Sequence, residues 1–193
     1  KGKLSKGDGE RARELLMKAL NDRFPGLRSE AFKATLSLDI GGGPGETLRV
    51  ALGSVHEDIR REVFVETSAQ KREDFAWPLL LDMLADPAPR LRNEVFSFAL
   101  KQARGKKVVE LIGRALAGDH VDLRSAAAAT IRSRKEEGLD GLIFEALDDD
   151  NEAVRREALT TLLVIDHPQL SRALGSAHGD VRARVALARA RHG

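Results

Sequence analysis

Apolar and polar positions along the 193-residue chain recur with a period of about 32 residues. An aliphatic residue followed by arginine occurs six times, and the arginines are separated by 32, 32, 32, 31 and 27 residues. A leucine stands eight residues before each arginine, an aliphatic residue stands twelve before it, and apolar residues stand three and four after it. Self-similarity at a fixed period of this length indicates a repeat protein.

Each repeat predicts two helices. Apolar offsets of three and four residues place these side chains on one face of a helix, whereas a strand would alternate. The leucine belongs to the first helix, and the second helix begins just before the arginine. Turn residues separate the two helices, as in Phe24-Pro25-Gly26 and Asp148-Asp149-Asp150. A helix pair cannot bury its apolar face alone, so neighbouring pairs should stack.

The predicted fold class is therefore all-α, an α-solenoid of about six two-helix repeats forming a single domain over residues 1–193. The repeats are expected at about residues 10–39, 45–70, 74–104, 106–135, 138–165 and 167–192. We number them 1 to 6.

This pattern resembles the HEAT-like repeats of the short, roughly 30-residue type found in phycobilin lyase subunits and many bacterial scaffold proteins. The resemblance rests on Ala146-Leu147, the acidic turn Asp148-Asp149-Asp150, Val154-Arg155 and Ala158, and on their counterparts over roughly residues 10 to 192. It implies a two-helix solenoid. Proteins with this repeat serve as scaffolds, lyase subunits, hydroxylases and nucleic-acid enzymes, so the resemblance leaves the function open.

The composition excludes several classes of protein. The chain has no cysteine, which excludes disulfides and thiolate chemistry and is compatible with a reducing cytoplasm. No apolar run approaches the length of a membrane span and no secretory signal is visible, so we expect a soluble, cytoplasmic protein. The chain starts at Lys1 without methionine and stops on an arginine-rich segment. Two expectations stay open here: a polar cap on a finished solenoid, or a fragment of a longer protein.

The repeated arginines have two interpretations. Regularly spaced guanidinium groups could track phosphates or clamp an acidic partner. Asp58, Asp122 and Asp180, each two residues before an arginine, favour a structural arginine ladder in which each arginine bonds to turn carboxylates or carbonyls at the repeat junction. The predicted ladder consists of Arg28, Arg60, Arg92, Arg124, Arg155 and Arg182.

A row of carboxylates follows the arginines on the second helices and forms the candidate partner face. Continuous phosphate backbone would be repelled by such a row, so the face favours a protein partner. The alternative is that these glutamates only solvate the helices and favour their N-terminal dipoles. The residues are Glu30, Glu62, Glu66, Glu94 and Glu157.

Positive charge gathers at the ends of the second helices in repeats 2 to 4, where stacking would align it as a candidate anionic rim. The sequence pI of about 9.0 is consistent with an anionic contact. The net charge of only +2 is low for a nucleic-acid protein, and helix dipoles alone favour cations at C-termini. The rim comprises Lys71, Arg72, Lys101, Arg104, Lys106, Lys107, Arg132, Arg134 and Lys135.

Histidines stand four residues before the arginine in alternate repeats, at His56, His120 and His178. A nearby carboxylate could suggest a metal site or an acid–base pair. Packed helices lie about 8–10 Å apart, so histidines in alternate repeats are too far from one another to share one metal. Because Asn151 occupies the same position in repeat 5, we expect these residues to cap helices.

The glycine-rich segment Gly41-Gly42-Gly43-Pro44-Gly45 lacks the lysine and Ser/Thr that a phosphate-binding loop needs directly afterwards. We expect it to be an inter-repeat turn, with Glu46 starting the next helix.

The sequence thus predicts a non-catalytic HEAT-repeat scaffold that mediates protein–protein interaction. This hypothesis includes no enzyme activity, cofactor, metal or small-molecule substrate. The main alternative is a sequence-nonspecific nucleic-acid-binding module that uses the basic rim. A weaker alternative is a HEAT-like lyase or enzyme subunit.

Overall fold

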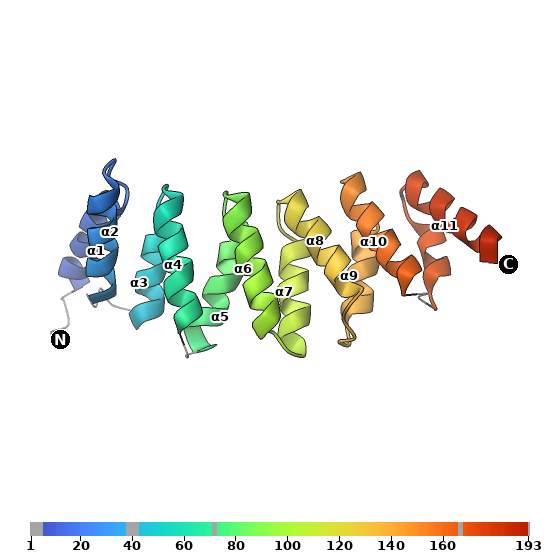
Figure 1. The fold of residues 1–193 in the computed structure, drawn as a ribbon, viewed down its shortest axis with the longest axis horizontal. Helices are drawn as coiled ribbons and strands as arrows, with labels where there is room; N and C mark the ends of the chain where they lie inside the picture. The colour runs from blue at the N-terminus through green and yellow to red at the C-terminus, as the bar shows by residue number, and fades with distance from the viewer. Residues whose placement is uncertain (1–5, 38–42, 71–72, 166–167, 193) are drawn as a thin grey trace. The chain divides into compact units, whose positions relative to one another are not determined.

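The chain is all-α. A computed structural model describes residues 6–37, 43–70, 73–165 and 168–192, and these residues form eleven α-helices and two short 3-10 helices without a strand (Figure 1). Each sequence repeat contributes a pair of helical elements. In repeat 3 the first element ends in the 3-10 turn η1, and in repeat 6 the first element is the 3-10 helix η2.

The helices have the following bounds: α1 Lys6–Leu20, α2 Pro25–Ser37, α3 Gly43–Leu52, α4 Glu57–Ala69, α5 Glu73–Asp82, η1 Met83–Ala85, α6 Pro89–Gln102, α7 Lys106–Leu116, α8 Val121–Ile131, α9 Leu139–Ala146, α10 Glu152–Val164, η2 Leu170–Gly175 and α11 Gly179–His192. None of the helices in the described ranges is long and apolar enough to cross a membrane.

The chain divides into two compact units, residues 1–91 and 92–193, and α6 contains the boundary. In unit 1, consecutive helices from α1 to α5 contact one another, and α1 also contacts α3, α2 contacts α4, and α3 contacts α5. In unit 2, α7 contacts α9 and α8 contacts α10 in the same way. Within each unit, these helices therefore pack against the equivalent helix of the adjacent repeat as well as against their neighbours in the chain.

The apolar columns form the core of each unit. The residue three after each arginine is buried in all six repeats, and the aliphatic residue twelve before it is buried in repeats 1 to 5. The residue directly before the arginine is at most 1% exposed in repeats 2 to 6, but Leu27 of repeat 1 is 49% exposed. Conversely, the repeated leucine is buried at Leu20, Leu84 and Leu147, and Leu174 of repeat 6 is 39% exposed. The exposed members of these columns thus fall in the first and last repeats, and Leu52 and Leu116 of the repeated leucine are half-buried.

Helix α3 begins at Gly43, three residues earlier than expected, so the prediction of a turn through Gly45 is wrong. Gly41 and Gly42 lie outside the described residues. Pro44 fits the first helical turn, where its missing N–H has no helical partner. A Cβ at Gly45 would lie only 2.8 Å from Phe75 Cβ, well inside normal carbon–carbon contact. Glycine is therefore required here by the close approach of α5.

Candidate interaction surfaces

Arg60 forms the most buried pair of the arginine ladder. Its Nε donates to Asp86 Oδ2 at 2.6 Å and its Nη2 donates to Asp86 Oδ1 at 3.2 Å. Its Nη1 donates to the main-chain oxygen of Ser54 at 3.0 Å. Side-chain exposure is 8% for Arg60 and 1% for Asp86. The planar guanidinium suits this site because one edge can hold a carboxylate at two points.

The other arginines repeat one or both halves of this geometry. Within each described unit, the guanidinium closes its own turn by bonding the carbonyl six residues earlier, and it bonds an aspartate of the next turn. Own-turn bonds are Arg28 to Asp22 O, Arg124 to Gly118 O, Arg155 to Asp149 O and Arg182 to Ser176 O, at 2.7–3.0 Å. Next-turn pairs are Arg28–Asp58, Arg92–Asp122, Arg124–Asp149 and Arg155–Asp180.

The aspartate of the next turn alternates between two positions, a feature that the sequence analysis missed. In repeats 2, 4 and 6 it stands two residues before the arginine, at Asp58, Asp122 and Asp180. In repeats 3 and 5 it stands six residues before, at Asp86 and Asp149. The sequence carries the signal, because Asp22, Asp86 and Asp149 all occupy the earlier position in the odd-numbered repeats.

The ladder carboxyls of the even-numbered repeats have lowered pKa values. Burial raises the pKa of Asp58, Asp122 and Asp180, but hydrogen bonds from Arg28, Arg92 and Arg155, with their positive charge, outweigh it. The pKa of each carboxyl is therefore held below the ordinary aspartate value. These pairs favour the ionised form, as expected of structural ion pairs.

His56 and His120 do not cap their helices through their side chains, so the prediction is wrong for these two residues. His56 and His120 occupy N-cap positions without a side-chain cap bond. Instead, His56 Nε2 lies 3.3 Å from Asn21 O and His178 Nε2 lies 3.3 Å from Asp148 O. The long imidazole reaches the adjacent turn, whereas the shorter Asn151 side chain accepts the N–H of Ala153 at 2.9 Å.

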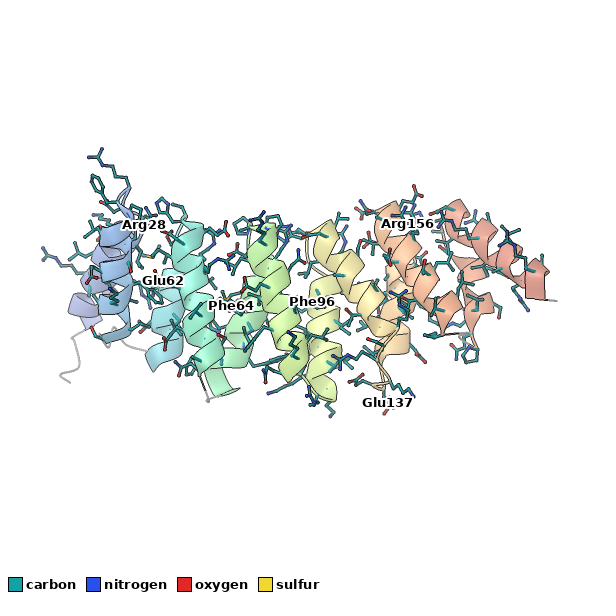
Figure 2. All side chains as sticks on the ribbon, viewed as in Figure 1. Arg28, Glu62, Phe64, Phe96, Glu137 and Arg156 are labelled. Carbon is teal, nitrogen blue, oxygen red and sulfur yellow. The ribbon has the colours of Figure 1, made fainter. Side chains whose placement is uncertain are left out.

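The carboxylate row lies on the second helices of both units. In unit 1, Glu30 pairs with Lys33 on α2 at 2.6 Å, and Glu66 accepts a bond from Gln70 on α4 at 2.6 Å. Glu62 is also on α4 (Figure 2). Because α2 and α4 are in contact, these three glutamates share one region of unit 1. In unit 2, Glu94 lies on α6 and Glu157 on α10.

Exposed apolar side chains accompany the glutamates of unit 1. Val65, between Glu62 and Glu66 in the sequence of α4, is 60% exposed. Leu36 near the end of α2 is 40% exposed. Positions three and four apart share a helical face, so Val65 lies near Glu62 on the surface. We call Glu30, Glu62, Val65, Glu66 and Leu36 the α2/α4 face.

Two arginines of the basic rim bind main-chain oxygens within the fold. Arg104 donates to the main-chain oxygens of Lys101 and Ala103 at 2.8 and 2.6 Å, and Arg134 donates to Leu100 O at 3.2 Å. These arginines satisfy carbonyls at the end of α6, a common arrangement at helix C-termini. Lys101, Lys106, Arg132 and Lys135 are exposed, Lys107 is half-buried, and the exposed Glu137 lies in the α8–α9 loop (Figure 2). Lys71 and Arg72 lie outside the described residues.

The described residues contain no group of three histidine or carboxylate side chains placed to hold a metal ion. No protein-family model matches the chain, and no curated protein matches it in sequence. Among solved structures, the chain is similar to the X-ray structure of YibA from E. coli, a structural genomics target. The two share 19% identity over 97% of this chain and 76% of YibA, with a TM-score of 0.46. Similarity at this level assigns the chain neither a family nor a function.

Proposed function

We propose that the chain is a non-catalytic scaffold, an α-solenoid of HEAT-like repeats, that binds a protein segment along the α2/α4 face. The repeated arginine pairs and the contacts between equivalent helices of adjacent repeats support the solenoid. In this arrangement, most of the charged side chains at the repeat junctions hold the structure together, and the exposed helix faces are left for binding.

The observation that carries the proposal is the 60% exposure of Val65 between two glutamates. Protein interfaces combine an apolar centre with a polar border, and large exposed apolar side chains are their usual contact points. A partner segment that presents basic residues beside an apolar one would match Glu62, Glu66 and Val65. Nucleic acid would not, because its phosphates would face carboxylates.

The test is capture of a partner by the intact chain carrying Glu62→Lys and Glu66→Lys. The matched control is Glu10→Lys with Glu14→Lys, which reverses two exposed charges, also four residues apart, on α1 of the same unit. Each protein is cross-linked in a nuclease-treated extract of its native cells, and the captured proteins are quantified by mass spectrometry. We expect a protein that the wild type and control capture and the α4 variant loses. If no captured protein shows this dependence, the α2/α4 face is not the docking surface.

A second candidate function is nucleic-acid binding through the basic rim. The bond from Arg134 to Leu100 O brings the α8–α9 loop to the end of α6, and it thereby gathers the exposed Lys101, Arg132 and Lys135. Fluorescence anisotropy of double-stranded DNA and single-stranded RNA at about 50 and 200 mM salt tests it, because counterion release weakens phosphate contacts by orders of magnitude over this range. Salt-sensitive binding lost in Lys106→Glu with Arg132→Glu would support the rim. Absence of binding at the lower salt would exclude it.

A further inference from the structure

Arg182 in repeat 6 supplies one half of a ladder junction, by which we mean an arginine bonded to its own turn and paired with the aspartate of the next turn. Its Nη1 donates to Ser176 O at 2.7 Å and to Ala177 O at 2.9 Å, as the other arginines do in their own turns. Within the described ranges, no carboxylate pairs with it. Arg28, Arg60, Arg92 and Arg155 are 6–9% exposed, whereas Arg182 is exposed to solvent. Its guanidinium is thus held in the ladder orientation with the edge that elsewhere binds the next aspartate turned to solvent.

Asp22 in repeat 1 holds the other half. Its Oδ1 accepts the N–H of Phe24 at 2.8 Å. Asp86 and Asp149 accept the N–H two residues later in the same way, both at 2.8 Å. In those two aspartates Oδ2 faces the arginine of the preceding repeat, at 2.6 Å from Arg60 Nε and 2.8 Å from Arg124 Nε. Among the described residues, no guanidinium pairs with Asp22 Oδ2, so this carboxylate is preformed for an arginine.

The apolar surroundings of the two half-junctions are also uncovered. Leu27, beside Arg28, is 49% exposed, although its counterparts in repeats 2 to 6 are at most 1% exposed. Leu174, eight residues before Arg182, is 39% exposed, whereas its counterparts are buried in repeats 1, 3 and 5 and half-buried at Leu52 and Leu116. The two half-junctions therefore combine opposite charges with apolar side chains that are more exposed than their counterparts in the interior repeats.

We propose that the chain associates head to tail with a second copy, with Arg182 of one copy bound to Asp22 of the other. The order of repeat types agrees with this pairing. The arginines of repeats 2 and 4 bind an aspartate that stands six residues before the next arginine. Repeat 6 would find an aspartate at that same position in repeat 1 of the second copy. The contact is heterologous, so it generates rings if it closes and open filaments if it does not. This assembly is independent of the α2/α4 face, which contains neither Asp22 nor Arg182.

The test is sedimentation velocity of the intact chain over a hundredfold range of concentration, with the variants Asp22→Asn and Arg182→Gln. Asparagine keeps the oxygen that accepts the Phe24 N–H but replaces Oδ2 by a donor. We expect the wild type to increase in mass with concentration, and each variant to weaken association by about tenfold or more, since hydrogen bonds to charged groups are the strong ones. An equal mixture of the two variants should recover a species of two chains, because each supplies the half that the other lacks.

The matched controls are Asp119→Asn and Arg184→Gln, which alter an exposed turn aspartate and an exposed arginine of α11. Both should associate like the wild type, and circular dichroism should show all variants folded. A wild type that stays monomeric over the whole range would overturn the proposal. Association that Asp22→Asn and Arg182→Gln leave unchanged would overturn it as well.

Discussion

Arg60 and Asp86 form a buried two-point ion pair although 26 residues separate them in the chain. Arg60 comes from α4 and Asp86 from the turn after η1, so the pair joins two consecutive repeats. The same guanidinium also closes the turn before α4 through Ser54 O. One side chain therefore fixes both the shape of its own hairpin and the position of the next turn.

Removing Arg60 should destabilise the protein strongly. Arg60→Ala leaves the Asp86 carboxylate buried without its cation, and breaking a buried pair on one side costs about 3–5 kcal/mol of unfolding free energy. Urea unfolding followed by circular dichroism measures the loss. The control is Arg61→Ala, which removes the exposed partner of Glu57 and should change the unfolding free energy by less than about 1 kcal/mol. Similar losses in the two variants would contradict the structural role of the ladder.

Acid should weaken the fold through the ladder aspartates. The pKa values of Asp58, Asp122 and Asp180 are lowered in the folded chain, so their ionised forms contribute stability at pH values above the unfolded aspartate pKa of about 3.9. This contribution is lost as the pH falls through the lowered folded pKa values. We expect a thermal midpoint that changes little from about pH 7 to 5 and falls below about pH 4.

Calorimetry of Asp122→Asn against wild type checks this assignment. The variant should be less stable at neutral pH. Its thermal midpoint should fall less steeply below about pH 4, because a carboxyl group with a lowered pKa has been removed. Parallel curves for the two proteins would show that Asp122 does not contribute to the acid sensitivity.

Gly45 should not tolerate a side chain. Gly45→Ala places a Cβ 2.8 Å from Phe75 Cβ, so α3 or α5 must shift, and such overpacking costs about 1–3 kcal/mol. Gly26→Ala in α2 is the control, since a Cβ there would have nothing within 4 Å, and alanine favours helix. Thermal unfolding should show a lower midpoint for the first variant and an equal or higher one for the second. Equal midpoints would mean that α3 and α5 are not in close contact.

The N-cap bond of α10 should depend on the length of the side chain at position 151. Asn151 and His56 have nearly the same N-cap backbone, with φ −92°, ψ 122° and φ −91°, ψ 124°. Asn151→His should therefore fit the backbone but lose the bond to the Ala153 N–H, at a cost of about 1 kcal/mol. Asn151→Ser keeps a capping oxygen and should stay close to the wild type in chemical denaturation. A histidine variant as stable as the serine variant would contradict this assignment.

Local spacing explains why much of the core could be predicted. Val63, Val95 and Ala158 are buried because three-to-four spacing assigns them to one helical face, which depends only on neighbouring residues. The contact of Gly45 with Phe75 could not be predicted in this way, since it depends on how closely two helices approach. A glycine-rich stretch has the same appearance in a turn and in a tightly packed helix start.

Charged residues were harder to interpret than apolar ones. Lys101, Arg104, Arg132 and Arg134 were indistinguishable in the sequence, yet Arg104 and Arg134 donate to main-chain oxygens. Which arginine finds a carbonyl depends on loop geometry. The aspartate alternates between two residues before the arginine, as at Asp58, and six residues before it, as at Asp86. This alternation could be predicted from the sequence only by comparing every second repeat.

The turn within a helix pair and the connection between pairs should differ in their tolerance of insertions. Within a pair, the arginine bonds the carbonyl six residues earlier. This bond is made by Arg28, Arg60, Arg124, Arg155 and Arg182 and fixes the length of the turn between the helices of a pair. The variation in repeat length, from 32 to 27 residues, falls instead in the connections between pairs, because the leucine stays eight residues before the arginine throughout. An epitope tag or a fused domain would therefore be accommodated between the pairs, for example after Lys135, and would break the fold if placed within a pair.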